Sequence, residues 1–237
     1  MIGAAHRFVC CKGAIDMLID EQGYKIVVDV IDPDTCDDLA FRCHGLQKSS
    51  AGSRRLLDHG WCRQVGMEIQ SKLVRAIDSI DHLTLVQCTY FDKSPTSNWL
   101  VTWHQDCSVP VSSRVDSPEL TGWSTKEGMT FVYGPDELLA KMLAVRLHLN
   151  DSLATNGPLR VIPGSHRFGT LSDAEIERQR HEREEVSCIV PKGGVLAMRP
   201  LILHASSKST STVPRRVLHF LFGPMTLPHG LQWAPIG

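Results

Sequence analysis

The stretch WLVTWHQDCSVP, residues 99–110, places His104 and Asp106 two positions apart inside an otherwise apolar run. Residues i and i+2 of a β-strand point to the same face, so both side chains can approach one point in space. Burying two polar groups without partners would cost on the order of a few kcal/mol. The stretch therefore predicts a strand whose polar pair meets a partner from elsewhere in the chain.

Beyond Ile80 the chain consists of short runs of β-type residues separated by Gly, Pro, Asn, Asp and Ser clusters. Many short strands with such punctuation are typical of a barrel or a double-sheet jelly roll. The sequence thus predicts a mainly β fold with helices at the N-terminal side. The expected strands are residues 83–91, 98–103, 141–149, 158–162, 186–190, 193–198 and 215–222.

The first third of the chain is predicted to be helical, with a single strand in YKIVVDVI, residues 24–31. A helix is expected from Asp32-Pro33 to about residue 46. Apolar residues at 61, 65, 69, 73, 77 and 80 have helical spacing, which predicts an amphipathic helix over 58–80. We therefore expect one domain over residues 1–237, with helical support over about 1–80 and a jelly-roll core over about 83–222.

Two segments interrupt this pattern. Residues 107–135 are long and rich in turn residues, which predicts a functional or disordered loop. Residues 172–185 open with Ser172 and Glu175, the spacing of a capping box, and predict a solvated surface helix.

Composition excludes several classes of protein. The net charge is -1, so there is no basic excess to indicate a nucleic-acid partner. No apolar run approaches the roughly 20 residues of a membrane span, and no signal peptide is apparent. The eight cysteines form no C-x-x-C pair, as expected for small hydrophobic residues in a reducing compartment. We expect a cytoplasmic protein; nothing in the sequence bears on its oligomeric state.

A candidate for the missing partner is His204, which ends an apolar run and precedes a Ser/Thr-rich loop. Two His and one carboxylate on one face of a metal are the facial triad of non-haem Fe(II) oxygenases. His-x-Asp alone is a weak signal, since such a pair is common by chance. Arg215 strengthens it: it lies eleven residues after His204, and a buried arginine needs an anion such as a carboxylate.

Three separated motifs occur in order: WHQD (103–106), NGPLRVIPGSHR (156–167) and His204 followed by Arg215. Together they resemble the phytanoyl-CoA dioxygenase family, whose members depend on Fe(II) and 2-oxoglutarate and have a double-stranded β-helix core. The resemblance extends from about Gly23 to Phe222.

The resemblance implies roles for individual residues. His104, Asp106 and His204 would bind iron. Arg215 and Ser206 would bind the distal carboxylate of 2-oxoglutarate. Gln87 is either a cosubstrate contact or a strand residue paired with neighbouring backbone. The implied reaction consumes O2 and 2-oxoglutarate and releases succinate and CO2.

One position departs from the family, where an aromatic residue commonly lies eleven residues before the Gly of the NG motif. Here it is Arg146, which could contact 2-oxoglutarate or an acidic substrate, or could face outward to a surface acid. Related halogenases replace the metal carboxylate with a small residue. Because Asp106 is retained, we expect hydroxylation rather than halogenation, with desaturation, epimerisation or cyclisation as alternatives.

Other histidines and Arg216 are expected to be structural. His166 lies in a Pro-Gly turn, and His148 and His219 lie within apolar strands. Arg216 should point away from the site, because adjacent strand residues face opposite ways.

The substrate is expected to be a small molecule, such as an amino acid derivative or a natural-product intermediate. Two other classes of protein remain: a non-catalytic cupin-like binding module and a zinc hydrolase. A zinc hydrolase would have no use for Arg215, and this sequence contains no HExxH motif. Candidate substrate contacts, chosen from their position near or within the 107–135 segment, are Trp103, Arg114, Trp123, Phe131 and Tyr133.

Overall fold

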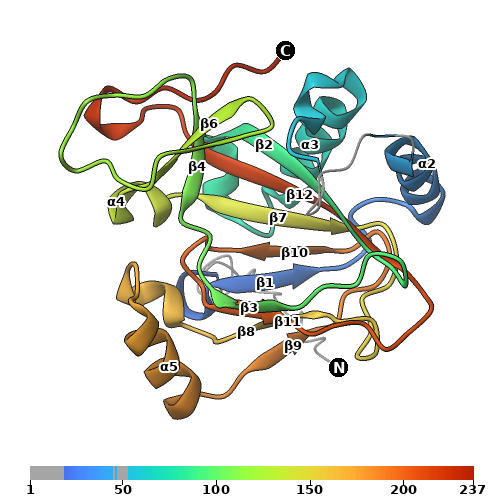
Figure 1. Cartoon of the computed structure of the whole chain (residues 1–237). Coiled ribbons are helices and arrows are strands. Elements are labelled where there is room, and N and C mark those ends of the chain that lie inside the picture. Colours follow the sequence, from blue (N-terminus) through green and yellow to red (C-terminus); the bar gives the residue numbers. More distant parts are fainter. Residues whose placement is uncertain (1–18, 45, 47–52) are drawn as a thin grey trace, which may run out of the picture.

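The computed structural model describes residues 19–44, 46 and 53–237. Its larger sheet has five strands, and every neighbouring pair is antiparallel. This sheet crosses the middle of the molecule (Figure 1). In spatial order its strands are β1 (Tyr24–Val27), β10 (Val195–Met198), β7 (Leu143–His148), β12 (Arg215–Pro224) and β2 (Leu83–Lys93).

A second sheet faces the first. Its four strands are β3 (Val101–His104), β11 (His204–Ser206), β8 (Leu159–Val161) and β9 (Val186–Cys188), in that spatial order. The chain passes repeatedly between the two sheets, from β2 to β3, β7 to β8, β9 to β10, β10 to β11 and β11 to β12. This alternation is the double-stranded β-helix, so the predicted fold class is confirmed.

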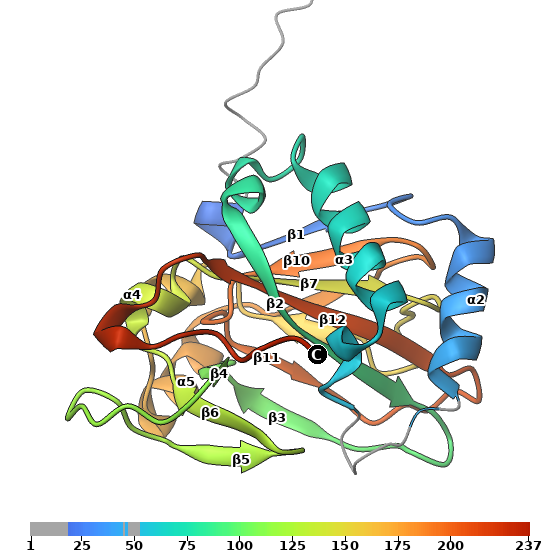
Figure 2. The same ribbon diagram turned by 90° about the horizontal axis from the view of Figure 1, so that it is seen from above.

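Alternating residues of the larger sheet belong to two different environments. On β7, Leu143, Val145 and Leu147 belong to a core that also contains the helices, whereas Arg146 and His148 are buried on the opposite face. The helices α2 (Pro33–His44) and α3 (Gly60–Leu73) cover the outer face (Figure 2). The inner face of the sheet, which points toward the second sheet, therefore carries buried polar side chains such as Arg146 and His148.

The 107–135 segment is not the long loop predicted. It contains a third sheet, β4-β6-β5, formed by β4 (Ser108–Val111), β6 (Met129–Tyr133) and β5 (Ser124–Lys126). Strands β5 and β6 are joined by Glu127 and Gly128, both with positive φ, as in a type I′ hairpin. The strands are short and lie among turn residues, which is why the pattern of the sequence concealed them.

The helices differ in length from those predicted. Helix α3 ends at Leu73 rather than at residue 80, because the chain turns there and continues as a 3-10 helix, η2 (Asp78–His82). Ile77 and Ile80 are nevertheless fully buried. The apolar spacing therefore continues past the end of the helix because these residues still pack in the core. The other helices are α4 (Asp136–Leu139), α5 (Asp173–Glu182), and the 3-10 turns η1 (Leu56–Asp58), η3 (Ser165–Phe168) and η4 (Pro228–Gly230).

The local prediction of a capping box is confirmed. Ser172 and Glu175 form the reciprocal capping box at the start of α5. The described cysteines are all free thiols, and Cys107 alone among them is not buried; Cys10 and Cys11 lie outside the described residues. No helix of the described residues is long and apolar enough to cross a bilayer.

Candidate metal and cosubstrate site

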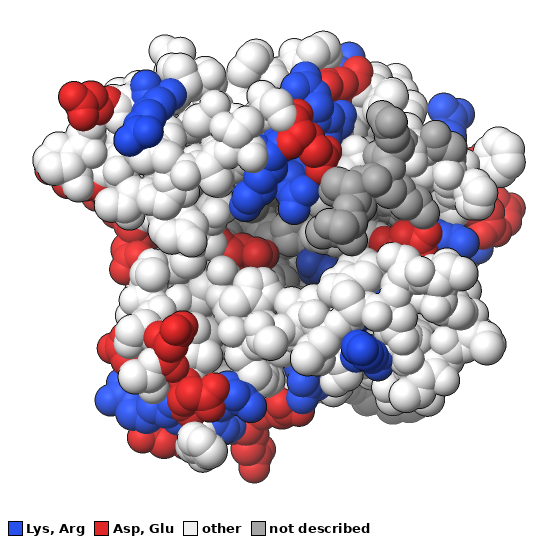
Figure 3. All heavy atoms as spheres, viewed as in Figure 1, with Lys and Arg blue, Asp and Glu red and all other residues white. Residues whose placement is uncertain are grey.

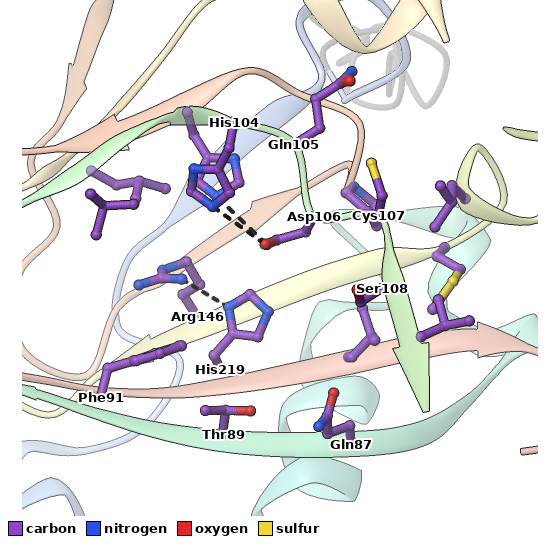
Figure 4. Close-up of a pocket in the computed structure, with 18 of the residues that line it drawn as sticks. Gln87, Thr89, Phe91, His104, Gln105, Asp106, Cys107, Ser108, Arg146 and His219 are labelled. Atoms are coloured by element: carbon purple, nitrogen blue, oxygen red, sulfur yellow. Dashed lines mark hydrogen bonds and ion pairs between the residues drawn. The ribbon is translucent and has the colours of Figure 1, made fainter. Parts of the chain in front are cut away.

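His104 and His204 lie directly opposite each other where β3 and β11 pair. Their ring centres are 4.2 Å apart, and both side chains line the cavity between the two sheets, where Figure 4 shows His104 beside Asp106. His104 ends its strand and His204 begins its own, so a single antiparallel pairing brings together two residues that are one hundred positions apart in the sequence.

Asp106 follows β3 and turns its carboxylate toward both rings. Its backbone N–H donates to the carbonyl of Pro200 over 2.9 Å, which ties the end of β3 to the chain before β11. Its Oδ1 is 3.6 Å from Nε2 of His104, and its Oδ2 is 3.6 Å from Nε2 of His204. One ligand atom from each of the three residues lies within 4.8 Å of the others, so the structure brings together the predicted triad.

The hydrogen bonds of the two imidazoles suit metal binding. Nδ1 of His104 donates to the carbonyl of Thr102 over 2.9 Å, and Nδ1 of His204 donates to the carbonyl of Ile202 over 2.9 Å. With the proton on Nδ1, each Nε2 presents a lone pair toward Asp106. Two imidazole nitrogens and one carboxylate on one side of a shared space are the donor set that non-haem Fe(II) prefers.

The electrostatics also favour a bound cation. Burial lowers the pKa of His204 to about 4, so this ring is neutral near pH 7. Burial alone would raise the pKa of Asp106, but the imidazoles of His204 and His104 hold it well below its usual range. The triad therefore keeps an ionised carboxylate and a neutral imidazole ready to bind a metal.

Gln105, between the two metal-site residues, has a structural role. Its side-chain amide donates to the carbonyls of Gly169 over 2.8 Å and Leu201 over 2.7 Å, and accepts from the backbone N–H of Leu171 over 2.8 Å. The amide thus fastens the end of β3 to two other segments and fixes the direction in which its neighbours point.

The triad opens into a cavity of about 680 Å³ between the sheets. Figure 3 shows one face of the molecule hollowed at its centre, with Lys and Arg side chains gathered along one edge of the hollow. The floor of the cavity is the inner face of the larger sheet, including Gln87, Thr89 and Phe91 of β2. Gln87 thus lies where a cosubstrate contact was predicted, and its side chain has no backbone partner among the described hydrogen bonds.

Arg215 points into this cavity and is only 3% exposed. Its Nε and one terminal nitrogen are buried and have no hydrogen-bond partner among the residues that the structure describes. Burial, with a contribution from the charge of Arg146, lowers the pKa of Arg215 to about 9, which still leaves it charged near pH 7. A buried guanidinium with unused donors is a site for an anion. Arg216 faces the other way, 3.7 Å from Asp92, as predicted.

Lys93 is a residue of this site that the sequence did not single out. It lies opposite Arg215 in the β2–β12 pairing and is 1% exposed. Its Nζ donates to Oγ of Ser206 over 2.8 Å and to the carbonyl of Ser207 over 2.7 Å. Burial and the charges of Arg215 and Arg146 lower its pKa to about 7. Lys93, Arg215 and Ser206 therefore converge on one anion-binding corner.

Arg146 faces inward from β7, which excludes the outward alternative and leaves the two inward possibilities, a contact to 2-oxoglutarate or to an acidic substrate. NH1 of Arg146 donates to Nδ1 of His219 over 2.9 Å. His219 lines the cavity rather than only filling the core, a position that the sequence did not indicate because it depends on the pairing of β7 with β12. Burial lowers the pKa of His219 to about 3, so it is neutral.

The candidate substrate contacts divide into two groups. Trp103, Phe131 and Tyr133 line the cavity. Arg114 and Trp123 do not line it; the guanidinium of Arg114 lies 5.5 Å from the centre of the Trp123 ring, and the indole N–H donates to the carbonyl of Leu120. These two side chains therefore interact with each other and with the backbone at Leu120, outside the lining of the cavity.

The other histidines lie away from the triad. Nε2 of His166 donates to the carbonyl of Asp20 over 3.0 Å, and the ring packs against Gly23. His148 is buried on β7, and burial lowers its pKa well below the usual value. Both therefore have the structural positions that the sequence predicted.

Comparison with solved structures shows the same fold. EctD from S. alaskensis, solved with 2-oxoglutarate and 5-hydroxyectoine, matches with a TM-score of 0.67 and 16% identity over 93% of this chain and 83% of its own. The epimerase SnoN, solved with Fe3+, alpha ketoglutarate and nogalamycin RO, matches with a TM-score of 0.69 and 14% identity over 95% of this chain and 87% of its own.

Sequence comparison identifies the family. The chain is 27% identical over 150 residues to L-proline trans-4-hydroxylase of Streptomyces griseoviridis, an alignment that covers 52% of this chain and 48% of that protein. The chain thus spans about half the length of the curated relative it matches. Residues 19–217 match the family described as Phytanoyl-CoA dioxygenase (PhyH). The chain therefore belongs to the phytanoyl-CoA dioxygenase family of Fe(II)- and 2-oxoglutarate-dependent oxygenases.

Proposed function

We propose that this chain hydroxylates a small-molecule substrate, consuming 2-oxoglutarate and O2 and releasing succinate and CO2. Iron would be held by Nε2 of His104, Nε2 of His204 and the carboxylate of Asp106. The three ligands lie on one side of the metal position, so the opposite side is free for cosubstrate, O2 and substrate. When bound, Fe(II) and 2-oxoglutarate supply the O2 activation that oxidises a substrate C–H bond.

The protein's own residues position the cosubstrate. Arg215 can present its unused N–H donors to a carboxylate as a two-pronged fork. Ser206 and Lys93 already converge beside it, so the carboxylate would replace solvent with charge-assisted hydrogen bonds. These three residues would fix the distal end of 2-oxoglutarate and aim its keto acid end at the metal.

The single observation that carries the proposal is the unpaired guanidinium of Arg215 in the same cavity as the triad. A zinc hydrolase with these three ligands has no use for a buried arginine beside them. A non-catalytic cupin-like module has no reason to keep both a complete facial triad and an anion-binding corner. An oxygenase that binds a dicarboxylic keto acid needs both features together.

Hydroxylation of a small molecule is supported by four further observations. Asp106 is retained as the third ligand candidate. The cavity of about 680 Å³ has the size of a pocket for small ligands. The curated relative is a hydroxylase of a free amino acid, which makes L-proline the first substrate to assay. The side chains of Trp103, Phe131 and Tyr133 supply apolar surface in the cavity wall.

The proposal is tested by measuring succinate released from 2-oxoglutarate, with and without Fe(II), and with labelled O2 in the presence of candidate substrates. We expect succinate formation to require Fe(II) and to be absent in Asp106→Ala. Absence of both turnover and iron binding would favour the binding module. A hydrolytic rate that does not respond to 2-oxoglutarate would favour the hydrolase.

A further inference from the structure

Arg146 is a buried cation on the floor of the cavity. It lies at the centre of β7, with His219 of β12 on one side and Leu196 of β10 on the other. Its side chain is directed into the barrel, and the residue is 6% exposed. The guanidinium reaches across β12, where NH1 donates to His219, and its carbon lies 5.4 Å from the centre of the Phe91 ring on β2.

This crossing places the guanidinium beneath the triad, between it and Phe91 (Figure 4). The charge of Asp106 reaches Arg146 and opposes the lowering of its pKa by burial. The charge of Arg146 in turn reaches Arg215 and Lys93 and lowers the pKa of each. Arg146 therefore lies within electrostatic reach of both the metal position and the corner that would hold the distal carboxylate.

Arg146 has no ion-pair partner among the residues that the structure describes, and its Nε is buried without a hydrogen-bond partner. Asp106 is turned toward the two imidazoles and cannot also neutralise Arg146, Arg215 and Lys93. A buried charge without compensation destabilises a fold strongly. This surplus of positive charge indicates that an anion with more than one carboxylate belongs on the floor of the cavity.

The hydrogen bond to His219 decides which edge of Arg146 is available. His219 is neutral and accepts from NH1, so the edge that carries Nε remains free to present two parallel N–H donors to a carboxylate. The Phe91 ring flanks the guanidinium and His219 anchors one of its nitrogens, so Arg146 is held for binding before the ligand arrives.

We propose that Arg146 binds the 1-carboxylate of 2-oxoglutarate, next to the metal, so that this chain grips each end of its cosubstrate with a separate arginine. The inference rests on the proposed function. His219 acts as the positioning residue that orients Arg146. The other inward possibility for Arg146, a carboxylate of the substrate, becomes an outcome of the test.

The test uses dissociation constants measured by calorimetry on anaerobic, Fe(II)-loaded protein. Two ligands are compared: 2-oxoglutarate, and 2-oxopentanoate, which has the same keto acid end but no distal carboxylate. The variants are Arg146→Met and Arg215→Met. The matched control is Arg216→Met, because Arg216 is the next residue on the strand and faces Asp92 instead of the cavity. Arg146→Gln has no charge but keeps a donor, and replaces Arg146→Met if that variant does not fold.

Arg146→Met should weaken both keto acids by about 10- to 100-fold, because it acts on the end that they share. Arg215→Met should weaken 2-oxoglutarate by a similar factor and leave 2-oxopentanoate unchanged. Arg216→Met should change neither. If Arg146→Met leaves both constants within about 2-fold, the inference is overturned, and loss of substrate binding alone in that variant assigns Arg146 to the substrate. If Arg215→Met also leaves 2-oxoglutarate unchanged, the proposed function fails as well.

Discussion

The ammonium of Lys93 is hydrogen-bonded to Oγ of Ser206, 113 positions later in the chain, over 2.8 Å. This bond joins the end of β2 on the larger sheet to β11 on the smaller one. Arg215 lies directly opposite Lys93 in the sheet, so two buried cations stand side by side, and neither forms an ion pair with a carboxylate of the described residues. The pairing creates an anion-binding corner in which the protonation of Lys93 depends on whether an anion is bound.

Cosubstrate binding should therefore take up a proton. Lys93 has a pKa of about 7 because of burial and the charges of Arg215 and Arg146; the neighbouring His148 is neutral. At about pH 8 Lys93 is mostly neutral, and a carboxylate in the corner favours its charged form, so close to one proton should be bound per 2-oxoglutarate. At about pH 6 Lys93 is already charged, and the uptake should disappear.

The uptake is measured by calorimetry at each of these two pH values, in two buffers with different ionisation enthalpies. Lys93→Met is the control, since it removes the titrating group and should show no uptake at either pH. Equal uptake in the wild type and in Lys93→Met would assign the proton to another group.

The same ionisation makes stability depend on pH. Burial holds the pKa of Lys93 below its ordinary value of 10.5, so the folded state binds fewer protons than the unfolded state between about pH 7 and pH 10.5. Burying the charged Lys93 therefore lowers the stability of the folded state by the full amount below about pH 7, and by less and less as the pH rises toward 10.5. Relative to the wild type, Lys93→Met should gain on the order of a few kcal/mol more at about pH 6 than at about pH 9.5.

Urea unfolding of both proteins at these two pH values checks this prediction. A stability difference that does not change with pH would mean that Lys93 has the same pKa in the folded and unfolded states, so that burial does not shift it. Addition of 2-oxoglutarate at about pH 6 should stabilise the wild type more than the variant, because the anion compensates the charge.

Removal of Asp106 should abolish metal binding while leaving the fold intact. Its carboxylate is the anionic member of the triad and lies 3.6 Å from each imidazole. Mutation of a residue that only hydrogen-bonds to a metal ligand typically lowers metal affinity by roughly 10- to 100-fold. Asp106→Ala removes a ligand itself and should lower the Fe(II) affinity by more than that. Anaerobic calorimetry gives the affinity, and an unchanged circular dichroism spectrum controls for folding. Asp173→Ala, at another carboxylate that lines the cavity, should bind Fe(II) normally.

Most strands of both sheets and the members of the triad were within reach of the sequence. Apolar runs and turn clusters predict these strands, although not β11, and the triad follows from its residue types together with the family resemblance. The third sheet was not predictable in this way. Its strands β4 and β5 have four and three residues, which is too short for a period to emerge among the turn residues around them.

The anion-binding residues show where sequence reasoning ends. Gln87 and Lys93 are an even number of residues apart on β2 and therefore lie on the same face, so the inward position of Lys93 could have been predicted. A lysine at a strand end is nevertheless usually solvated, and here distant segments that include Ser206, Ser207 and Gly157 surround it and bury it. In the same way, the bond between Arg146 and His219 depends on the register of β7 and β12, which no local pattern specifies.

Gly157 of the NG motif is expected to be required for the shape of this corner. Its φ is +69°, and an added Cβ would lie 2.5 Å from the carbonyl oxygen of Ser207 and 3.2 Å from Nζ of Lys93. Gly128 is the matched control: its φ is +75°, but an added Cβ there meets open space. Gly128→Ala should cost only the backbone strain, about 1–2 kcal/mol.

Gly157→Ala should cost that strain and a further 1–3 kcal/mol, roughly, because the backbone of Ser207 and the buried Lys93 must both move. It should also weaken 2-oxoglutarate binding, whereas Gly128→Ala should not. Unfolding free energies from urea titration and dissociation constants from calorimetry measure the two effects. If both variants lost the same stability and both bound 2-oxoglutarate normally, the close packing of Gly157 on Lys93 would have no part in forming the corner.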